Sequence, residues 1–275
     1  MGARTRGKGA ESMLKLEHVS IVFNPGTVNE KTALDDVSLH IQPGDFVTMI
    51  GGNGAGKSTL LNCVSGAYLP TRGKILIDGA DVTNMPEYRR AALLGRVFQD
   101  PMMGTAGNLW IEENLSLALR RGKKRGLKWQ ITGDERKFFR EQLARLDLGL
   151  EDRMTTKVKL LSGGQRQALT LLMATLSRPK LLLLDEHTAA LDPKTALKVL
   201  SLSDQIVEES KLTTLMVTHN MRDAIRHGNR LVMMNESRIA LDIAGEEKRK
   251  LTVESLLSRF SIVSGSDEVD DKLVL

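Results

Sequence analysis

The sequence GGNGAGKS at residues 51–58 restricts the possible folds of this chain more than any other segment does. It satisfies every fixed position of G-x-x-x-x-G-K-[ST] and stands between a short apolar run, 46–50, and a helically spaced segment, LLNCVSGAY. Glycines let the backbone curl so that successive N–H groups point at one phosphate, and the helix that follows adds its positive N-terminus. The pattern predicts a phosphate-binding loop in an α/β domain, and we name residues 51–58 the phosphate loop.

This motif assigns chemistry to two of its side chains. Lys57 is expected to reach the β- and γ-phosphates of a nucleotide, and Ser58 to offer its hydroxyl to Mg²⁺. We therefore expect ATP and Mg²⁺ as cofactors. The residues expected to bind the nucleotide here are Gly51, Asn53, Gly54, Ala55, Gly56, Lys57, Ser58 and Thr59.

A phosphate loop needs a carboxylate at the end of a neighbouring strand, and the sequence LLLLDE at 181–186 provides one. Four leucines predict a fully buried strand. Asp185 then lies at the carboxyl end of this strand, where it can bind Mg²⁺ through its water shell, and Glu186 is positioned to polarise an attacking water.

The sequence LSGGQ at 161–165, which we name the signature segment, precedes an amphipathic stretch, 168–177. A helix that begins with Ser-Gly-Gly presents free N–H groups and its dipole to a second anion. Taken alone, the segment indicates only a helix cap. The residues concerned are Ser162, Gly163, Gly164 and Gln165.

The order of these elements along the chain resembles that of the ATP-binding-cassette (ABC) ATPases. The phosphate loop is followed by Gln99 after a strand, by the signature segment, by LLLLDE, by Ala190-Leu191-Asp192, and by His219 after another strand. The resemblance covers roughly residues 14 to 240. It implies an α/β fold: a P-loop NTPase core with a mixed sheet, an antiparallel β-subdomain and an inserted α-helical subdomain.

The resemblance also implies roles for particular residues around the nucleotide. Phe23 stands where the family has an aromatic residue, often Tyr, that stacks on adenine. Gln99 contacts Mg²⁺ or the attacking water and senses the membrane partner. Glu186 is the general base, and His219 holds the γ-phosphate.

Two further implications concern a second copy of the chain. Ser162 and Gly164 close over the γ-phosphate bound by the other subunit, and Asp192 lies at the dimer seam. The active unit that the resemblance implies is therefore a head-to-tail dimer with two shared sites.

The sequence departs from the family pattern at one position, where His187 follows Glu186 in place of the usual Pro. We interpret His187 as a loop residue near the nucleotide, not as a replacement for His219. The sequences DEHTAALDP and VFQDPMMGTA resemble one branch of importer ATPases that is linked to amino-acid-like solutes.

Residues 13–260 are expected to form one domain, with a helical subdomain at about 100–178 inserted in a RecA-like core. Residues 1–12 are expected to be a disordered arm and 261–275 a polar tail. Periodicity predicts strands at 14–23, 33–41, 46–50, 181–185 and 213–218, a hairpin at 230–234 and 238–243, and helices at 108–119, 134–147, 168–177, 194–209 and 251–260.

Composition indicates where in the cell this domain works and which partners it has. The chain has a single cysteine, which excludes an internal disulfide framework, and its apolar runs are shorter than the ~18–20 residues that span a bilayer. We expect a cytoplasmic protein, peripheral on the inner face of the membrane through a partner. The basic run at 120–128 is expected to be a solvated loop, and the alternative is that it faces anionic lipid when the chain is docked at a membrane. Only 4% of the residues are aromatic, which disfavours base stacking, so no nucleic-acid partner is expected.

The function predicted is that of an ATPase subunit that powers a membrane ABC transporter, most naturally an importer, by ATP-driven dimerisation. Its partners are separate transmembrane permease subunits, a second copy of itself and a solute-binding protein. The alternative that stays open is a soluble ABC ATPase of the iron–sulfur-assembly type. Neither the solute nor the direction of transport follows from the sequence.

Overall fold

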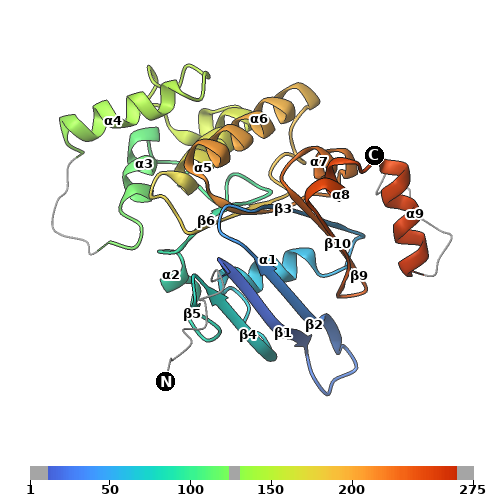
Figure 1. Cartoon of the computed structure of the whole chain (residues 1–275). Coiled ribbons are helices and arrows are strands. Elements are labelled where there is room, and N and C mark those ends of the chain that lie inside the picture. The colour runs from blue at the N-terminus through green and yellow to red at the C-terminus, as the bar shows by residue number, and fades with distance from the viewer. Residues whose placement is uncertain (1–11, 124–130, 265–275) are drawn as a thin grey trace, which may run out of the picture.

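The computed structural model describes residues 12–123 and 131–264 (Figure 1). The expectations for the N-terminal arm, apart from Ser12, for Lys124, Arg125 and Lys128, and for the tail beyond 264 lie outside these residues. Two sheets and the helices around them make up the described fold.

A four-stranded antiparallel sheet forms the base of the molecule (Figure 1). Its strand order is β2-β1-β4-β5, with β1 at Leu14–Phe23, β2 at Lys31–Ile41, β4 at Arg72–Ile77 and β5 at Ala80–Asp81. Apolar residues alternate along these strands, so that Leu14, Leu16, Ile75 and Ile77 are buried on one face.

A six-stranded sheet lies above it, in the order β10-β9-β3-β8-β7-β6. The strands from β9 to β6 are mutually parallel, and β10 is an antiparallel edge strand. Their bounds are β3 at Phe46–Gly51, β6 at Leu94–Val97, β7 at Leu181–Asp185, β8 at Thr213–Val217, β9 at Arg230–Asn235 and β10 at Arg238–Ala244.

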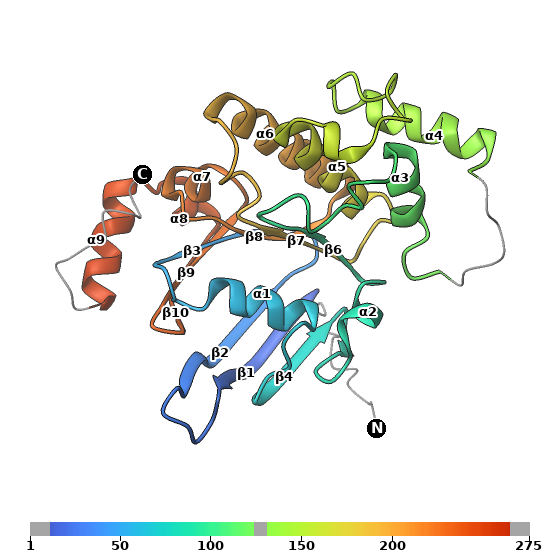
Figure 2. The ribbon, with the colours of Figure 1, turned by 180° about the vertical axis from the view of Figure 1, so that it is seen from behind.

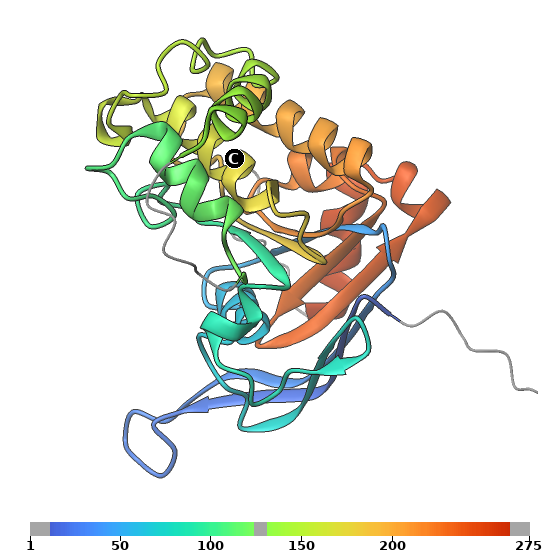
Figure 3. The ribbon, with the colours of Figure 1, turned by 90° about the vertical axis from the view of Figure 1, so that its left-hand side faces the viewer.

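Helices cover both faces of this sheet. Helix α1 (Lys57–Ser65) lies between the two sheets, and α3 to α6 form a helical layer on the opposite face (Figures 2 and 3). Helices α7 to α9 pack at the β9–β10 edge. The remaining bounds are α2 at Glu87–Arg90, α3 at Ile111–Leu119, α4 at Gly133–Ala144, a 3₁₀ turn at Val158–Leu160, α5 at Gly163–Thr175, α6 at Pro193–Ser210, α7 at Met221–Arg226, α8 at Gly245–Arg249 and α9 at Val253–Ser264.

The alternation of side chains along β7 places the carboxylate that follows its leucines. Leu181 and Leu183 belong to the apolar core around α1, whereas Leu182 and Leu184 belong to the core under the helical layer. With a period of two residues, Asp185 points to the α1 face at the carboxyl end of the strand. The LLLLD sequence is buried because helices cover both sides of this parallel sheet.

The structure confirms the predicted fold class, and every strand and helix predicted from periodicity is found with small shifts at its ends. The largest shift is at α5, which begins at Gly163 and not at 168, and α9 continues to Ser264. Strands β4 and β5 and helices α2, α7 and α8 were not predicted. Most of these are too short to show a period.

The expectation of a solvated basic loop is wrong at its first residues. Arg120 pairs with Glu135 at 2.9 Å, and the Arg121 guanidinium donates to the carbonyl oxygens of Leu94 and Met173 at 3.2 and 2.6 Å. Both side chains are held in the helical layer because their long stems reach back over it.

Among the helices of the two described segments, none has the length and apolar character needed to cross a membrane.

Candidate functional site

Backbone geometry explains the glycines of the phosphate loop. Gly51 has φ +152° and Gly56 has φ +102°, backbone conformations that residues other than glycine rarely adopt. A Cβ atom would lie 2.3 Å from the Met234 carbonyl oxygen at Gly51, and 2.6 Å from the Ala33 carbonyl oxygen at Gly56. No side chain caps the N-terminus of α1, so the N–H groups of its first turn are available to an anion.

The Lys57 side chain folds back over this loop. Its Nζ donates to the carbonyl oxygens of Gly51 and Gly52, at 2.6 and 3.0 Å, and only 7% of the residue is exposed. Burial lowers the pKa of the Lys57 amine, and the carboxylates of Glu186 and Asp185 oppose that shift. The ammonium therefore lies where the loop, α1 and two carboxylates meet.

Asp185 lies at the end of β7, beside α1. Its Oδ2 accepts a hydrogen bond from Arg96 Nη2 at 3.1 Å, and 14% of its side chain is exposed. Burial raises the pKa of Asp185, while the bond from Arg96 opposes the shift. The carboxylate of Asp185 and the hydroxyl of Ser58 are oxygen donors, which suit Mg²⁺. The described segments hold no cluster of three or more His, Cys, Asp or Glu residues with metal-site geometry.

Glu186 and His219 meet across the ends of β7 and β8. His219 Nδ1 lies 3.5 Å from Glu186 Oε2. The Glu186 N–H donates to the Val217 carbonyl oxygen, its own carbonyl oxygen accepts from the Ala189 N–H, and its φ is +43°. A left-handed glutamate is uncommon and is held by its surroundings. The sheet therefore aims this carboxylate at His219.

A cavity of about 230 Å³ lies beside the phosphate loop and Glu186, and neither Asp185 nor His219 is in its lining. Its lining comprises Phe23, Lys31, Ala33, Asn53, Gly54, Ala55, Gly56, Lys57, Ser58, Thr59 and Glu186. Lys31 and Ala33 begin β2 and were not predicted as site residues. Lys31 is brought in by the strand register, which pairs it with Phe23, and no local motif marks it.

Phe23 lies at this cavity with its ring held by a neighbour. Its centroid is 5.3 Å from that of Tyr68, at an interplanar angle of 79°. Such an edge-to-face pair leaves the broad face of one ring open to stacking. Tyr68 follows α1, and the sequence alone did not link it to Phe23.

The signature segment lies outside the cavity, since none of its residues is in the lining. Ser162 caps α5, with its hydroxyl accepting from the Gln165 N–H at 3.3 Å. Asp192 caps α6 in the same way, accepting from the Thr195 N–H at 3.1 Å. The two helix starts touch, because a Cβ on Gly164 would lie 2.1 Å from Thr195 Cγ2.

Two further predicted residues also lie away from the cavity lining. Gln99 is exposed after β6. His187 is only 2% exposed, its Nε2 lies 3.0 Å from Ser203 Oγ on α6, and burial lowers its pKa to about 4. His187 thus does not line the cavity, and its neutral ring attaches the chain after Glu186 to α6.

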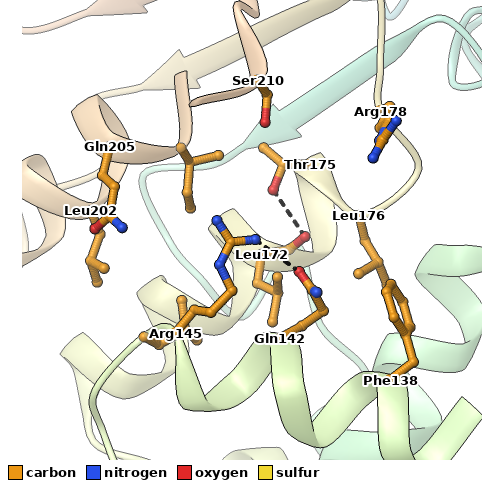
Figure 4. Close-up of a pocket in the computed structure, with 12 residues that line it drawn as sticks. Phe138, Gln142, Arg145, Leu172, Thr175, Leu176, Arg178, Leu202, Gln205 and Ser210 are labelled. Atoms are coloured by element: carbon orange, nitrogen blue, oxygen red, sulfur yellow. Dashed lines mark hydrogen bonds between the residues drawn. The ribbon is translucent and has the colours of Figure 1, made fainter. Parts of the chain in front are cut away.

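A separate pocket of about 170 Å³ lies in the helical layer, between α4, α5 and α6 (Figure 4). Arg145 and Gln142 lie side by side at its rim, joined by a bond of 3.3 Å, and Leu172 and Leu202 form part of its wall. None of the predicted site residues lines it. The phosphate-loop cavity is thus the candidate site.

Three features define an ATP-binding cassette: the phosphate loop, the carboxylates of Asp185 and Glu186 at the end of β7, and the signature segment at the start of α5. Comparison with known proteins gives the same class. Residues 34–189 match the family model described as ABC transporter. The chain belongs to this family of ATPases. Its site is accordingly an ATP-binding site.

Curated relatives extend the similarity beyond the matched segment. A tyrosine transport ATP-binding protein of Clostridioides difficile (strain R20291) is 45% identical over 248 residues, covering 90% of this chain and 98% of that protein. The methionine import ATP-binding protein MetN of Corynebacterium efficiens is 34% identical and covers 86% of this chain. The chain spans 64% of the length of that MetN.

A solved structure shows the same architecture. The ATP-binding cassette MJ0796, in a dimeric post-hydrolysis state bound to ADP and Pi, superposes with a TM-score of 0.72. It is 32% identical, and the alignment covers 84% of this chain and 98% of that one.

Proposed function

We propose that this chain is the ATP-hydrolysing subunit of a membrane importer, working as a head-to-tail dimer with separate permease subunits. The observation that carries the proposal is the incomplete cavity: one chain gathers Lys57, Ser58 and Glu186 there, while its signature segment lies elsewhere. The dimeric cassette bound to ADP and Pi supports completion of the site by a second copy. No observation favours the iron–sulfur-assembly alternative.

The proposed roles follow from position and chemistry. The phosphate-loop residues and Thr59 bind the phosphates, Lys57 turns from the loop carbonyls to the β- and γ-phosphates, and Phe23 stacks on adenine. Ser58, Asp185 and Gln99 would hold Mg²⁺, which would neutralise charge developing on the phosphates.

Hydrolysis needs a base and a residue that fixes the reacting phosphate. Glu186 accepts the proton of the attacking water, and His219, which contacts Glu186, orients the γ-phosphate. From the second copy, Ser162, Gly163, Gly164 and Gln165 present the N-terminus of α5 to the γ-phosphate, with Asp192 at the seam. The domain limits expected from the sequence, with a helical subdomain at about 100–178, are part of the same proposal.

A groove of about 360 Å³ near Gln99 supports a permease partner. We name it the docking groove; it lies between α2, α3, α5 and the segment after β6, and its lining includes Glu87, Phe98, Met103, Leu117, Arg121 and Met173. Met103 is 70% exposed and Leu117 48% exposed, so an apolar element of a partner would gain contact there. Binding in this groove would hold the chain at the inner face of the membrane.

The relatives guide the choice of solute. Because a tyrosine transport protein and a methionine import protein are both similar to this chain, we propose an amino-acid-like solute, delivered by a solute-binding protein. Uptake of labelled amino acids into vesicles holding the chain and its permease tests this choice, and the absence of ATP-dependent amino-acid uptake would contradict it.

The test of the enzyme is Glu186→Gln. We expect ATP turnover to fall by at least about a hundredfold, because the base is lost, while ATP binding persists and ATP-dependent dimers accumulate. Hydrolysis assays, nucleotide binding and light scattering measure the three outcomes. If the wild-type chain shows no turnover, alone or with its permease, the proposal is wrong.

A further inference from the structure

Arg96 connects elements that the proposed mechanism treats separately. It lies on β6, and its side chain crosses to the α1 face of the sheet. Its Nη2 donates to Asp185 Oδ2 at 3.1 Å and to Asn62 Oδ1 at 2.8 Å, and its Nη1 donates to Ser65 Oγ at 3.1 Å. The guanidinium is therefore anchored on α1 while it pairs with Asp185.

The same side chain reaches the docking groove. Arg96 and Phe98 both line it, and the guanidinium carbon lies 4.6 Å from the centroid of the Phe98 ring. Phe98 directly precedes Gln99. One cation thus touches the carboxylate at the end of β7, the helix of the phosphate loop and an aromatic ring of the groove.

We infer that Arg96 is a positioning residue that orients Asp185 for Mg²⁺ and links the docking groove to this carboxylate. The inference rests on the proposed function. Arg96 donates to Oδ2, and no hydrogen-bond donor among the described residues bonds to Oδ1, so Oδ1 remains available to a metal ion. Groups that fix a metal ligand from behind in this way control its affinity for the metal.

A purely space-filling role does not account for an arginine here. Its Nε is buried and lacks a hydrogen-bond partner within the described residues, which costs free energy that a neutral apolar side chain would avoid. Only 13% of the Arg96 side chain and 14% of that of Asp185 are exposed, so the pair is shielded from water and held in one geometry. The charge and its anchors are what a positioning role requires.

The test compares nucleotide binding with and without the metal. The affinity of each variant for a non-hydrolysable ATP analogue is measured by calorimetry in EDTA and in Mg²⁺. In Arg96→Met we expect the gain in affinity on adding Mg²⁺ to fall by about tenfold or more, with affinity in EDTA little changed. Arg96→Lys keeps the charge but cannot reach all three partners, so it should recover part of the gain.

Three further variants separate the alternatives. Arg121→Met alters another arginine of the docking groove, whose hydrogen bonds within the described residues go to backbone carbonyls, and it should keep the full gain from Mg²⁺. Phe98→Ala removes the ring under the guanidinium and should lower the gain by about two- to fivefold. Asn62→Ala removes one hydrogen-bond acceptor of Arg96. It provides a second test of the positioning role if Arg96→Met does not fold.

The outcomes are distinguishable. If Arg96→Met or, should it not fold, Asn62→Ala gains as much affinity from Mg²⁺ as the wild type, the positioning role is overturned while the proposed function stands. If Phe98→Ala leaves the gain unchanged, the link to the docking groove is overturned. If the wild type binds no nucleotide, the proposed function fails and this inference falls with it.

Discussion

Gly164 lies against the Thr195 side chain, so that an added Cβ would force one of the two to shift. A Cβ placed there would lie 2.1 Å from Thr195 Cγ2, far inside van der Waals distance. Gly164→Ala should therefore push the start of α5 away from α6 and lower the free energy of unfolding by about 1–3 kcal/mol, as overpacking does. Urea unfolding measures the loss, and ATP turnover should fall because the signature segment shifts.

A second substitution, at Thr195, should relieve the clash that Gly164→Ala introduces. Thr195→Ser removes the offending methyl group and retains the hydroxyl and the backbone N–H that Asp192 accepts from. The double variant Gly164→Ala/Thr195→Ser should thus recover most of the lost stability, while Gly163→Ala, whose Cβ would lie 3.4 Å from Leu191 Cδ2, should cost little. A double variant no more stable than Gly164→Ala would show that the methyl contact is not the cause.

At the scale of elements, the end of α1 depends on one buried side chain. Arg90 is fully buried and donates to four carbonyl oxygens, those of Cys63, Val64, Thr83 and Met85. The first two are at the C-terminus of α1, so Arg90 both caps the helix and fastens it to the segment before α2.

Arg90→Met should lower the free energy of unfolding by at least about 3 kcal/mol, because it leaves several buried carbonyls without a donor. The neighbouring arginine provides the control: Arg89 is exposed, and Arg89→Met should change stability by less than about 0.5 kcal/mol. Chemical unfolding of both variants decides the matter. Equal losses would mean that the buried guanidinium contributes nothing beyond the surface one.

Comparison of particular elements shows what the sequence could and could not predict. The phosphate loop and β7 were predicted because glycines and a leucine run are local signals of their conformations. The start of α5 at Gly163 was indicated by the Ser-Gly-Gly cap but not by periodicity, because the first turn, Gly-Gly-Gln, has no apolar residue and is a weak helix former. The sequence did not predict the positions of Lys31, Arg96 and Ser203, the partner of His187. Strand register and helix packing determine these positions, and no local sequence pattern indicates either of them.

At the scale of the whole molecule, the C-terminal elements are tied to the rest by a buried polar junction. His227, after α7, pairs with Asp204 of α6 at 2.7 Å. Lys248 of α8 donates to the carbonyl oxygens of His227 and Gly228 and is only 2% exposed. Helices α6, α7 and α8 are therefore connected through His227, Asp204 and Lys248.

This junction should give the molecule a pH-dependent stability at alkaline pH. Burial lowers the pKa of Lys248 from 10.5 to about 8, and Asp204 opposes the shift. Below pH 8 the amine is charged in both the folded and the unfolded state, so the folded state carries the full cost of burying that charge. Between pH 8 and 10.5 the unfolded chain holds more protons than the folded one, so stability from this group rises with pH, by up to about 3 kcal/mol.

Lys248→Met removes this titration, so the difference in unfolding free energy between the wild type and the variant should shift in favour of the wild type from pH 7.5 to 10.5. Urea unfolding at both pH values measures this difference in unfolding free energy. Groups that titrate in both proteins contribute equally to each and cancel in the difference. Lys250→Met changes an exposed lysine two residues further on and should follow the wild type at both values. Parallel pH profiles for the wild type and Lys248→Met would contradict the prediction, since they would mean that folding does not disfavour the charged amine of Lys248 at this junction.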